Sequence, residues 1–399
     1  MKYCPLFFIV ILIFSCKNKF KDNICKPVVD SSMVQIDLDK NGNSDDKLNR
    51  IIEVKEIIPL ETKTDFYIAD ITQCLRLDSL ILLLDAKYSR LLIYRQDGRL
   101  LREIGRLGDG IGEFENISNF FVDERKRLNL FSSESMKMLM YDIEGKFIGE
   151  KKVPFYAQSA IKISPNQYAF YTDYNKSEET GGFNLVFTDS LLKVRSFFSP
   201  YPDNPDGPVL SKISGGMFQS NTNSLIYGAF QDSIFEITDD SKVLKLKYVL
   251  NIKTNKIPEA IKADPSNSLK SNPSRVISYN QLHGAVFQTN SLLSFIYLEK
   301  RIPQQVLYDK IHRILIKNSK SSGFPKCLGK TIGVYSEDFI SYIDPDTYKR
   351  VILDNPDVEL YLKQLSPILY KALINMYTKQ TNPTLVIWGP KTIKKNIKS

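Results

Sequence analysis

The chain has 399 residues, of which 43% are hydrophobic and 25% are charged, with 54 Lys and Arg against 45 Asp and Glu. These proportions exclude a disordered, collagenous or coiled-coil protein, and a chain of this length can bury a sizeable core. The net charge of +9 is concentrated in the tails and leaves about +1 for residues 27–390, so no basic stripe for nucleic acid is expected.

The first fifteen residues are predicted to be an export signal. Lys2 precedes an apolar run over residues 6–14, which is shorter than the roughly 20 residues that a membrane-spanning helix needs. The sequence Ile-Phe-Ser-Cys at 13–16 resembles the bacterial lipobox, which implies cleavage before Cys16 and lipidation of that residue. The alternative is an ordinary secretory signal followed by an incidental cysteine.

A polar leash over residues 16–50 is expected to join the lipid to the folded body. Surface-displayed lipoproteins of the Bacteroidota commonly carry an acidic stretch directly after the lipidated cysteine, whereas residues 17–21 of this chain are basic. The sequence therefore favours a lipid anchor in the outer membrane that faces the periplasm, with surface exposure left open. Several acyl chains on one cysteine bury enough CH₂ groups for stable attachment.

Three cysteines remain after processing: Cys25, Cys74 and Cys327. In an oxidising compartment they allow one disulfide and one remaining thiol, and the sequence does not select the pair. Neither their spacing nor that of the two histidines, His283 and His312, matches a metal site. We predict no metal, no cofactor and no catalytic residue of a hydrolase triad.

A repeat with an offset of 47 residues indicates the architecture. Residues 93–103 and 140–150 share a Tyr, an acid, a Gly, a base, two apolar residues and a Glu at matching places. Weaker copies of the pattern lie at 185–194, 234–243, 307–315 and 332–343. A strand-rich period of about 40–50 residues is typical of propeller blades. We predict an all-β fold, a single six-bladed β-propeller over residues 51–390.

Two insertions lengthen the average blade. Residues 257–281 are predicted to form a long loop with a short helix, and residues 356–379 have apolar residues at helical spacing interrupted by Pro367. Two short helices are therefore as consistent with the second insertion as one. Residues 51–60 and 384–388 are expected to share a sheet and close the ring, since an open ring leaves strand edges unpaired. Residues 391–399 form a basic tail.

The glycine-rich segment 104–114, IGRLGDGIGEF, resembles the linker between blades of NHL-like and TolB-like six-bladed propellers. The motifs at 57–61, 170–175, 340–345 and 382–383 resemble those of the six-bladed β-propeller lipoproteins of the Bacteroidota. The resemblance implies a propeller exported to the cell envelope, and it implies little about activity. No Gly-Lys-Ser/Thr follows the glycines, so a tight crossover between blades is preferred to a phosphate loop.

Two segments supply candidate ligand-binding residues. Polar side chains of the glycine-rich linker are expected to line one face of the ring; they are Arg106, Asp109 and Glu113. The aromatic-rich segment 168–174 supplies Tyr171, Asp173 and Tyr174 as a platform for a sugar or peptide. Packing between blades is the alternative reading of these aromatic residues.

These features favour a monomeric, membrane-anchored binding module over an enzyme. Its expected ligand is a glycan, a peptide or an envelope protein bound across one face of the propeller. The alternative is a lyase or hydrolase that acts on glycans or peptides at the central channel, because a fold does not determine function. A third hypothesis is a scaffold that joins an outer-membrane complex. A polar cluster at the channel mouth would favour the enzyme, and a flat aromatic rim would favour binding.

Overall fold

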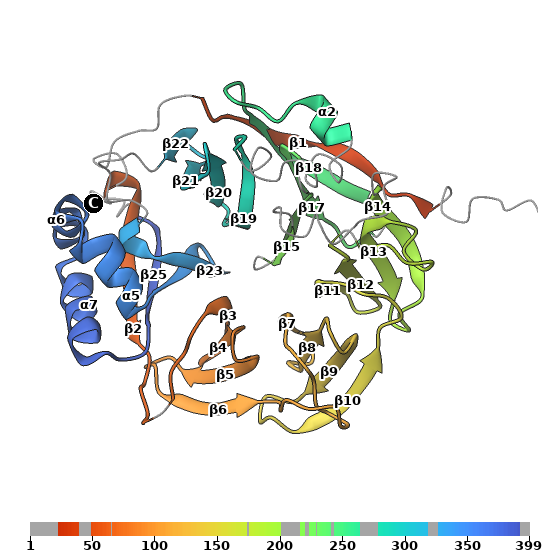
Figure 1. Cartoon of the computed structure of the whole chain (residues 1–399), viewed down its shortest axis with the longest axis horizontal. Coiled ribbons are helices and arrows are strands. Elements are labelled where there is room, and N and C mark those ends of the chain that lie inside the picture. The colour runs from red at the N-terminus through yellow and green to blue at the C-terminus, as the bar shows by residue number, and fades with distance from the viewer. Residues whose placement is uncertain are drawn as a thin grey trace, which may run out of the picture.

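Six β-sheets stand around a central axis like the blades of a propeller (Figure 1). The computed structural model describes residues 23–39, 49–64, 66–173, 175–200, 216–219, 223–228, 230–240, 243–263, 278–317 and 326–391. The predicted signal peptide, Cys16, Tyr174 and nearly all of the basic tail lie outside these residues. The prediction of an all-β, six-bladed propeller is confirmed.

Each blade runs outward from an inner strand at the axis. Blade 1 contains β3 (Ile71–Leu77), β4 (Leu80–Asp85), β5 (Arg90–Arg95) and β6 (Leu100–Ile104), and blade 2 contains β7 (Asn119–Val122), β8 (Leu128–Ser132), β9 (Lys137–Tyr141) and β10 (Phe147–Lys152). Blade 3 contains β11 (Ser159–Ser164), β12 (Gln167–Tyr171), β13 (Phe183–Asp189) and β14 (Val194–Pro200).

The second half of the ring follows the same plan. Blade 4 contains β15 (Gly216–Gln219), β16 (Ser224–Tyr227), β17 (Ser233–Ile237) and β18 (Val243–Asn251), and blade 5 contains β19 (Gln281–Gln288), β20 (Leu292–Glu299), β21 (Ile302–Asp309) and β22 (Ile314–Lys317). Blade 6 combines β23 (Lys330–Tyr335), β24 (Asp338–Ile343) and β25 (Thr384–Pro390) with the N-terminal strand β2 (Ile52–Pro59).

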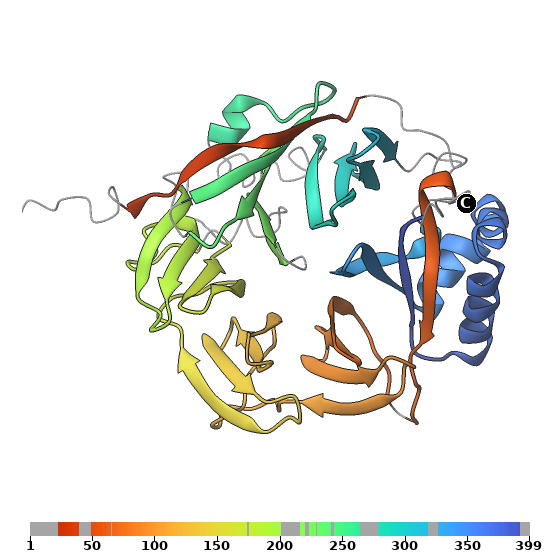
Figure 2. The same ribbon diagram turned by 180° about the vertical axis from the view of Figure 1, so that it is seen from behind.

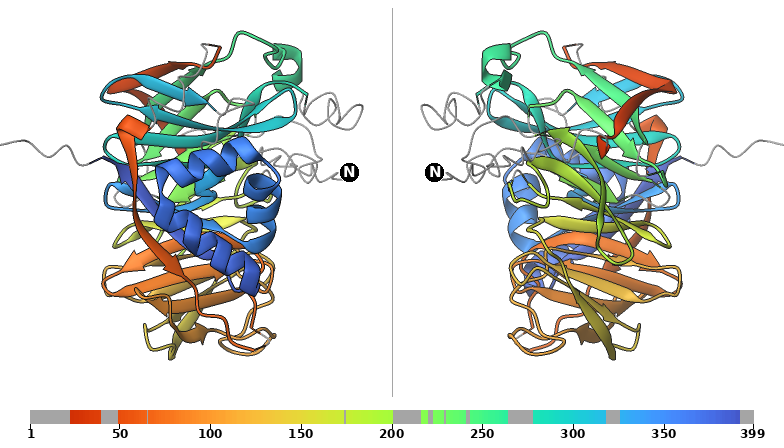
Figure 3. Two further views of the ribbon diagram at one scale, coloured as in Figure 1. Left: turned by 90° about the vertical axis from the view of Figure 1, so that its left-hand side faces the viewer. Right: turned by 90° about the vertical axis from the view of Figure 1, so that its right-hand side faces the viewer.

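The ring has two unlike faces, seen edge-on in Figure 3. Turns from the first to the second strand and from the third to the fourth strand of each blade lie on one side, here called the hairpin face. Connections between blades and turns from the second to the third strand lie on the other side, here called the connector face. The repeated glycines Gly98 and Gly145 have φ values of +85° and +87° in hairpin-face turns. A Cβ at Gly98 would also collide with the carbonyl oxygen of Pro59.

The two ends of the ring close within blade 6, as the sequence predicts. Strand β2 pairs antiparallel with β25, with Ile57 opposite Val386. The fully buried Trp388 donates from Nε1 to the Ser341 hydroxyl at 2.8 Å and packs on Phe339 at 4.7 Å between ring centres. Chain segments from opposite ends of the sequence therefore share one hydrogen-bonded sheet.

One strand corrects the expectation of a leash over residues 16–50. Strand β1 (Lys26–Asp37) pairs parallel with β18 and makes blade 4 five-stranded, as Figure 2 shows from behind. Ile24 forms a further bridge with Phe197 of β14, so the segment spans the rims of blades 3 and 4. Most of β1 is exposed, and only Ile36 in it is buried. A polar sequence is therefore tolerated there, and the sequence lacks the alternation of apolar and polar residues that would predict a strand.

Helices cover the outside of blade 6. The second insertion forms α5 (Pro345–Thr347), the π-helix η4 (Tyr348–Leu353), α6 (Pro356–Leu365) and α7 (Pro367–Lys379), so helical structure begins before residue 356. Pro367 opens α7, and the hydroxyl of Ser366 caps it by accepting from the Leu369 N–H at 3.2 Å. Helix α7 packs against β2 and β25. The first insertion contains the short helix α2 (Glu259–Ala263).

The three cysteines that the structure describes are buried thiols in different parts of the core. Cys25 packs between blades 3 and 4, Cys74 packs between blades 6 and 1, and Cys327 packs beneath the C-terminal helices. Separation into different clusters leaves no pair positioned for the disulfide that the sequence allowed. Among the described residues, no helix is long and apolar enough to cross a bilayer.

The closing sheet gives a stability prediction. Trp388→Ala should lower the free energy of unfolding by about 3–5 kcal/mol, because it empties a fully buried site and removes the donor to Ser341. Denaturant unfolding of the purified protein measures the effect. Tyr67→Ala is the control, since this side chain is 57% exposed and its loss should cost less than about 1 kcal/mol. Equal stability of the two variants would contradict the assigned role of the closing sheet.

Candidate functional site

A cavity of about 890 Å³ lies on the axis, and its lining includes residues from the inner strands of all six blades. Close approach of neighbouring inner strands forms its wall. Between blades 6 and 1, a Cβ at Gly333 would collide with the carbonyl oxygen of Cys74, so only glycine fits this contact. Such a concave site built from several elements is the usual form of a ligand pocket.

Side-chain amides join the first three inner strands. Gln73 donates to the Phe120 carbonyl at 2.7 Å and accepts from the Phe120 N–H at 3.1 Å. Asn119, one blade further on, makes the same pair of bonds with Ala160 at 2.7 and 2.9 Å. Each amide pairs with both the backbone N–H and the carbonyl oxygen of one residue in the next inner strand. These bonds hold the cavity wall in place without a ligand.

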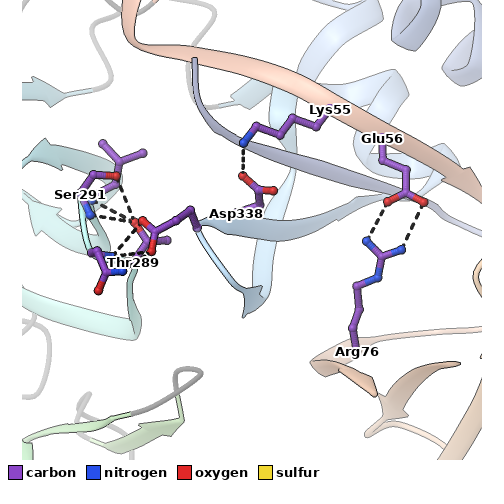
Figure 4. A network of polar contacts seen from close by, with 9 residues as sticks. Lys55, Glu56, Arg76, Thr289, Ser291 and Asp338 are labelled. Carbon is purple, nitrogen blue, oxygen red and sulfur yellow. Dashed lines mark hydrogen bonds and ion pairs between the residues drawn. The ribbon is translucent and has the colours of Figure 1, made fainter. Parts of the chain in front are cut away.

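Two of the described lining residues are charged, and each forms an ion pair with another residue of the protein. Arg76 forms a two-pronged ion pair with Glu56, at 2.7 and 3.2 Å, near the Lys55–Asp338 pair in Figure 4. Asp123 is paired with Arg127 at 2.6 Å. The remaining polar lining is uncharged and consists of Thr72, Gln73, Ser89, Asn116, Ser118, Asn119, Ser133, Tyr156, Gln158, Ser159 and Gln219. Amide and hydroxyl groups of this kind suit a ligand that is polar but uncharged.

At the connector face, the cavity mouth is edged by a small hydrogen-bonded network. Asn116 donates to the hydroxyls of Ser118 and Ser133 at 3.1 and 3.0 Å, and accepts from Ser132 at 2.8 Å. The Ser118 hydroxyl also donates to the Ser133 hydroxyl oxygen at 2.6 Å. These residues come from a blade connector and from a β-turn, so the network holds two separate loops in one position.

Asp173 lies behind this mouth in the turn after β12. It is only 6% exposed and has a left-handed φ of +49°, a strained backbone for a residue other than glycine. Burial raises the pKa of its carboxyl to about 6. Tyr156, which lines the cavity, interacts electrostatically with Asp173; burial first, and then Asp173, raises the pKa of this tyrosine. The protonated carboxyl can donate a hydrogen bond, which a carboxylate cannot.

The other predicted site residues that the structure describes lie elsewhere. Tyr171 is fully buried in the core between blades 3 and 4, in agreement with the packing alternative. Arg106 and Glu113 do come together, with Nε and Oε1 3.4 Å apart, and Asp109 is exposed in the same linker. None of these three is part of the central cavity lining. The linker is a tight crossover, in which Gly105 and Gly112 have φ values of +87° and +74°.

Sequence reasoning missed most of the mouth. Asn116, Ser133, Tyr156 and Gln158 come from connectors and turns of different blades, and each is an unremarkable polar residue in its own segment. One usable signal exists, because Asn116 and Gln158 each lie shortly before an inner strand. Aligning the residues that enter inner strands would have selected both positions.

Comparison with known proteins supplies the family. The chain belongs to the family described as Domain of unknown function (DUF4934), which matches residues 33–388. A crystal structure from Bacteroides fragilis, of a protein described as exported, has a TM-score of 0.70 and 20% identity over 90% of this chain and all of that chain. No curated protein matches the chain.

Two further structures resemble the chain less. A member of the DUF4221 family from Bacteroides vulgatus has a TM-score of 0.51 and 11% identity, and covers 86% of this chain and 99% of that chain. Virginiamycin B lyase from Staphylococcus aureus has a TM-score of 0.38 and 11% identity over 72% of this chain and 81% of that chain. The last likeness is too weak to bear on activity.

The buried carboxyl of Asp173 predicts a pH dependence. Since its folded-state pKa of about 6 lies above the ordinary Asp value of 3.8, its contribution to stability is complete below about pH 4 and is lost as the pH rises through 6. Asp173→Asn should therefore stabilise the protein at pH 7, by up to about 3 kcal/mol, and do so less at pH 4.5. Melting temperatures at both pH values measure this.

The exposed Asp109 offers a matched control for this substitution. Asp109→Asn should change the melting temperature little at either pH. The assignment fails if Asp173→Asn has the same effect at pH 4.5 and pH 7, because the stabilisation would then not arise from the ionisation of this carboxyl.

Proposed function

We propose that the chain is a cell-envelope module that binds an uncharged polar ligand, a neutral glycan or peptide segment, in its central cavity. One observation carries the proposal: in the cavity of about 890 Å³, the charged lining residues that the structure describes are already paired. A charged ligand would find no unmatched partner among the described lining residues. A neutral ligand can exchange hydrogen bonds with the amide and hydroxyl groups at the connector-face mouth.

An envelope location is supported by the sequence and by the comparisons. The lipobox-like segment ends at Cys16, and the linker 104–114 has the glycine pattern of NHL-like propellers. A structurally similar Bacteroides fragilis protein is described as exported. We infer that Cys16 carries the lipid and anchors a monomer to the outer membrane, facing the periplasm. The tether would then lie between Cys16 and Ile24, which bridges to Phe197 of β14.

Substitution of Cys16 tests the anchor. In the native host or a related bacterium, Cys16→Ser should abolish labelling by a radioactive or clickable fatty acid and move the protein from the membrane fraction to the soluble fraction. The wild-type chain should be labelled and remain with the outer membrane. Protease treatment of intact cells then distinguishes a periplasmic protein, which is protected, from a surface-displayed protein. Fatty-acid labelling that persists in the variant would rule out Cys16 as the site.

Ligand binding is tested by melting the purified chain in the presence of neutral oligosaccharides and uncharged short peptides. A ligand that prefers the folded state raises the melting temperature, by about 3 °C or more near 100 times its Kd. Gln158→Leu should remove at least half of the shift, since Gln158 is exposed at the mouth and its amide is lost. Gln364→Leu, exposed on α6, is the matched control and should retain the full shift.

Each outcome of this experiment is informative. An unchanged shift in Gln158→Leu would place the ligand elsewhere, and the absence of any shift would contradict a neutral small ligand and favour a protein partner. Turnover is the second candidate function, because Asp173, with its pKa of about 6, interacts electrostatically with the cavity residue Tyr156. Chromatography of the stabilising ligand after incubation would reveal products if the module is a lyase or hydrolase.

A further inference from the structure

A second cavity, of about 860 Å³, lies between blades 4 and 5 and shares no lining residue with the central one. Its walls are residues 31–35 of the added strand β1, the outer strands of blade 4, and hairpin-face turns of blades 5 and 6. Unlike the central cavity, this lateral cleft is rich in charge. Its lining contains Lys247, Lys310 and Arg313 together with Glu236 and Glu337.

Lys247 and Glu236 form ion pairs, and Glu337 accepts hydrogen bonds from neutral donors. Lys247 lies 3.1 Å from the carboxylate of Asp30 on β1 and 3.6 Å from that of Glu236. Glu236 also accepts from the Asn223 amide at 3.1 Å. Glu337 accepts from the backbone N–H and the side-chain amide of Asn290.

The two remaining cations, Lys310 and Arg313, form no ion pair with the described residues. The ammonium of Lys310 donates to the carbonyl oxygen of Thr289, a neutral acceptor. Burial lowers the pKa of Lys310 to about 8, and the charges that act on it are Glu337 and Glu236, which favour its ammonium form, and Lys247, which opposes it. Arg313 is exposed at the edge of the cleft. Lys310 is therefore partly buried without an ion-pair partner in the described residues.

The turn that carries both cations is held rigidly. Asp309 accepts from the backbone N–H groups of Ile311 and His312, both at 2.9 Å, and its other oxygen lies 2.8 Å from His312 Nδ1. The backbone N–H of Lys310 donates to the carbonyl oxygen of Ser291, in the adjacent turn, at 2.8 Å. Lys310 and Arg313 line the cleft, whereas Ile311 and His312 do not. The fixed turn thus presents two cations to one space, at little further entropic cost on binding.

We propose that the lateral cleft binds a ligand bearing a carboxylate, which lies between the Lys310 ammonium and the Arg313 guanidinium. The planar fork of Arg matches a carboxylate, and a partly desolvated Lys gains from an anionic acceptor. Glu236 and Glu337 face the same cleft and oppose a dianion such as phosphate more strongly than a single negative charge. Gln288, Asn290, Tyr308 and Ser336 add neutral polar groups to the lining around this position.

Tri-alanine with a free C-terminal carboxylate is the probe, and tri-alanine C-terminal amide is its matched neutral comparison. Isothermal titration of the full chain should show binding of the acid at least about 10-fold tighter than binding of the amide. Lys310→Gln and Arg313→Gln should each weaken binding of the acid by about 10-fold. Arg125→Gln, an exposed arginine in a turn of blade 2, makes the same change in net charge and should leave affinity unchanged.

Several results would overturn the proposal. They are equal affinity for the acid and the amide, no binding of the acid, an unaffected Arg313→Gln variant, and tighter binding of inorganic phosphate than of the acid. Melting curves establish that each variant is folded. Binding of the acid should survive Gln158→Leu in the central cavity, so this proposal and the central-cavity proposal stand or fall separately.

Discussion

Pairing of β2 with β25 is the constraint on which the rest of the molecule depends. A blade buries its two faces only against neighbouring blades, so an open ring would expose apolar sheet faces as well as strand edges. Closure sets the common radius at which six inner strands surround one cavity. Gly333 allows blades 6 and 1 to approach, while Gln73 and Asn119 fix the spacing of blades 1 to 3. The cavity is therefore a product of closure.

The sequence was sufficient for the architecture because the fold repeats itself. Gly98 and Gly145 occupy the same kind of turn, and their shared backbone requirement is visible in the printed sequence as a period. Closure and the helix boundary at Pro367 follow from local rules about strand edges and proline. Strand β1 escaped prediction because one partner strand and little burial impose almost no pattern on its residues.

The candidate site was harder to predict, since it has no contiguous sequence. The sequence points to Asp173 through its aromatic neighbours, yet its relevance comes from its burial and from its electrostatic interaction with Tyr156 in the connector before blade 3. The sequence offers three polar linker residues as equally good ligand-binding candidates: Arg106, Asp109 and Glu113. None of them is part of the cavity lining. In the sequence, Lys310 and Arg313 are ordinary residues of a hairpin turn. The fold sets them in one cleft with the edge of blade 4. Such combinations arise only when separate blades are set side by side.

The added strand has a mechanical consequence. Ile24 and β1 attach the N-terminal segment to the outer edges of blades 3 and 4, and no inner strand pairs with that segment. A force applied to the chain before Ile24 would enter at the rim and load the β1–β18 hydrogen bonds along the strand. The hydrogen bonds between the four strands of each blade and the closing sheet of blade 6 would not carry it first. A pull on this end of the chain would thus move the ring while its axial cavity keeps its shape.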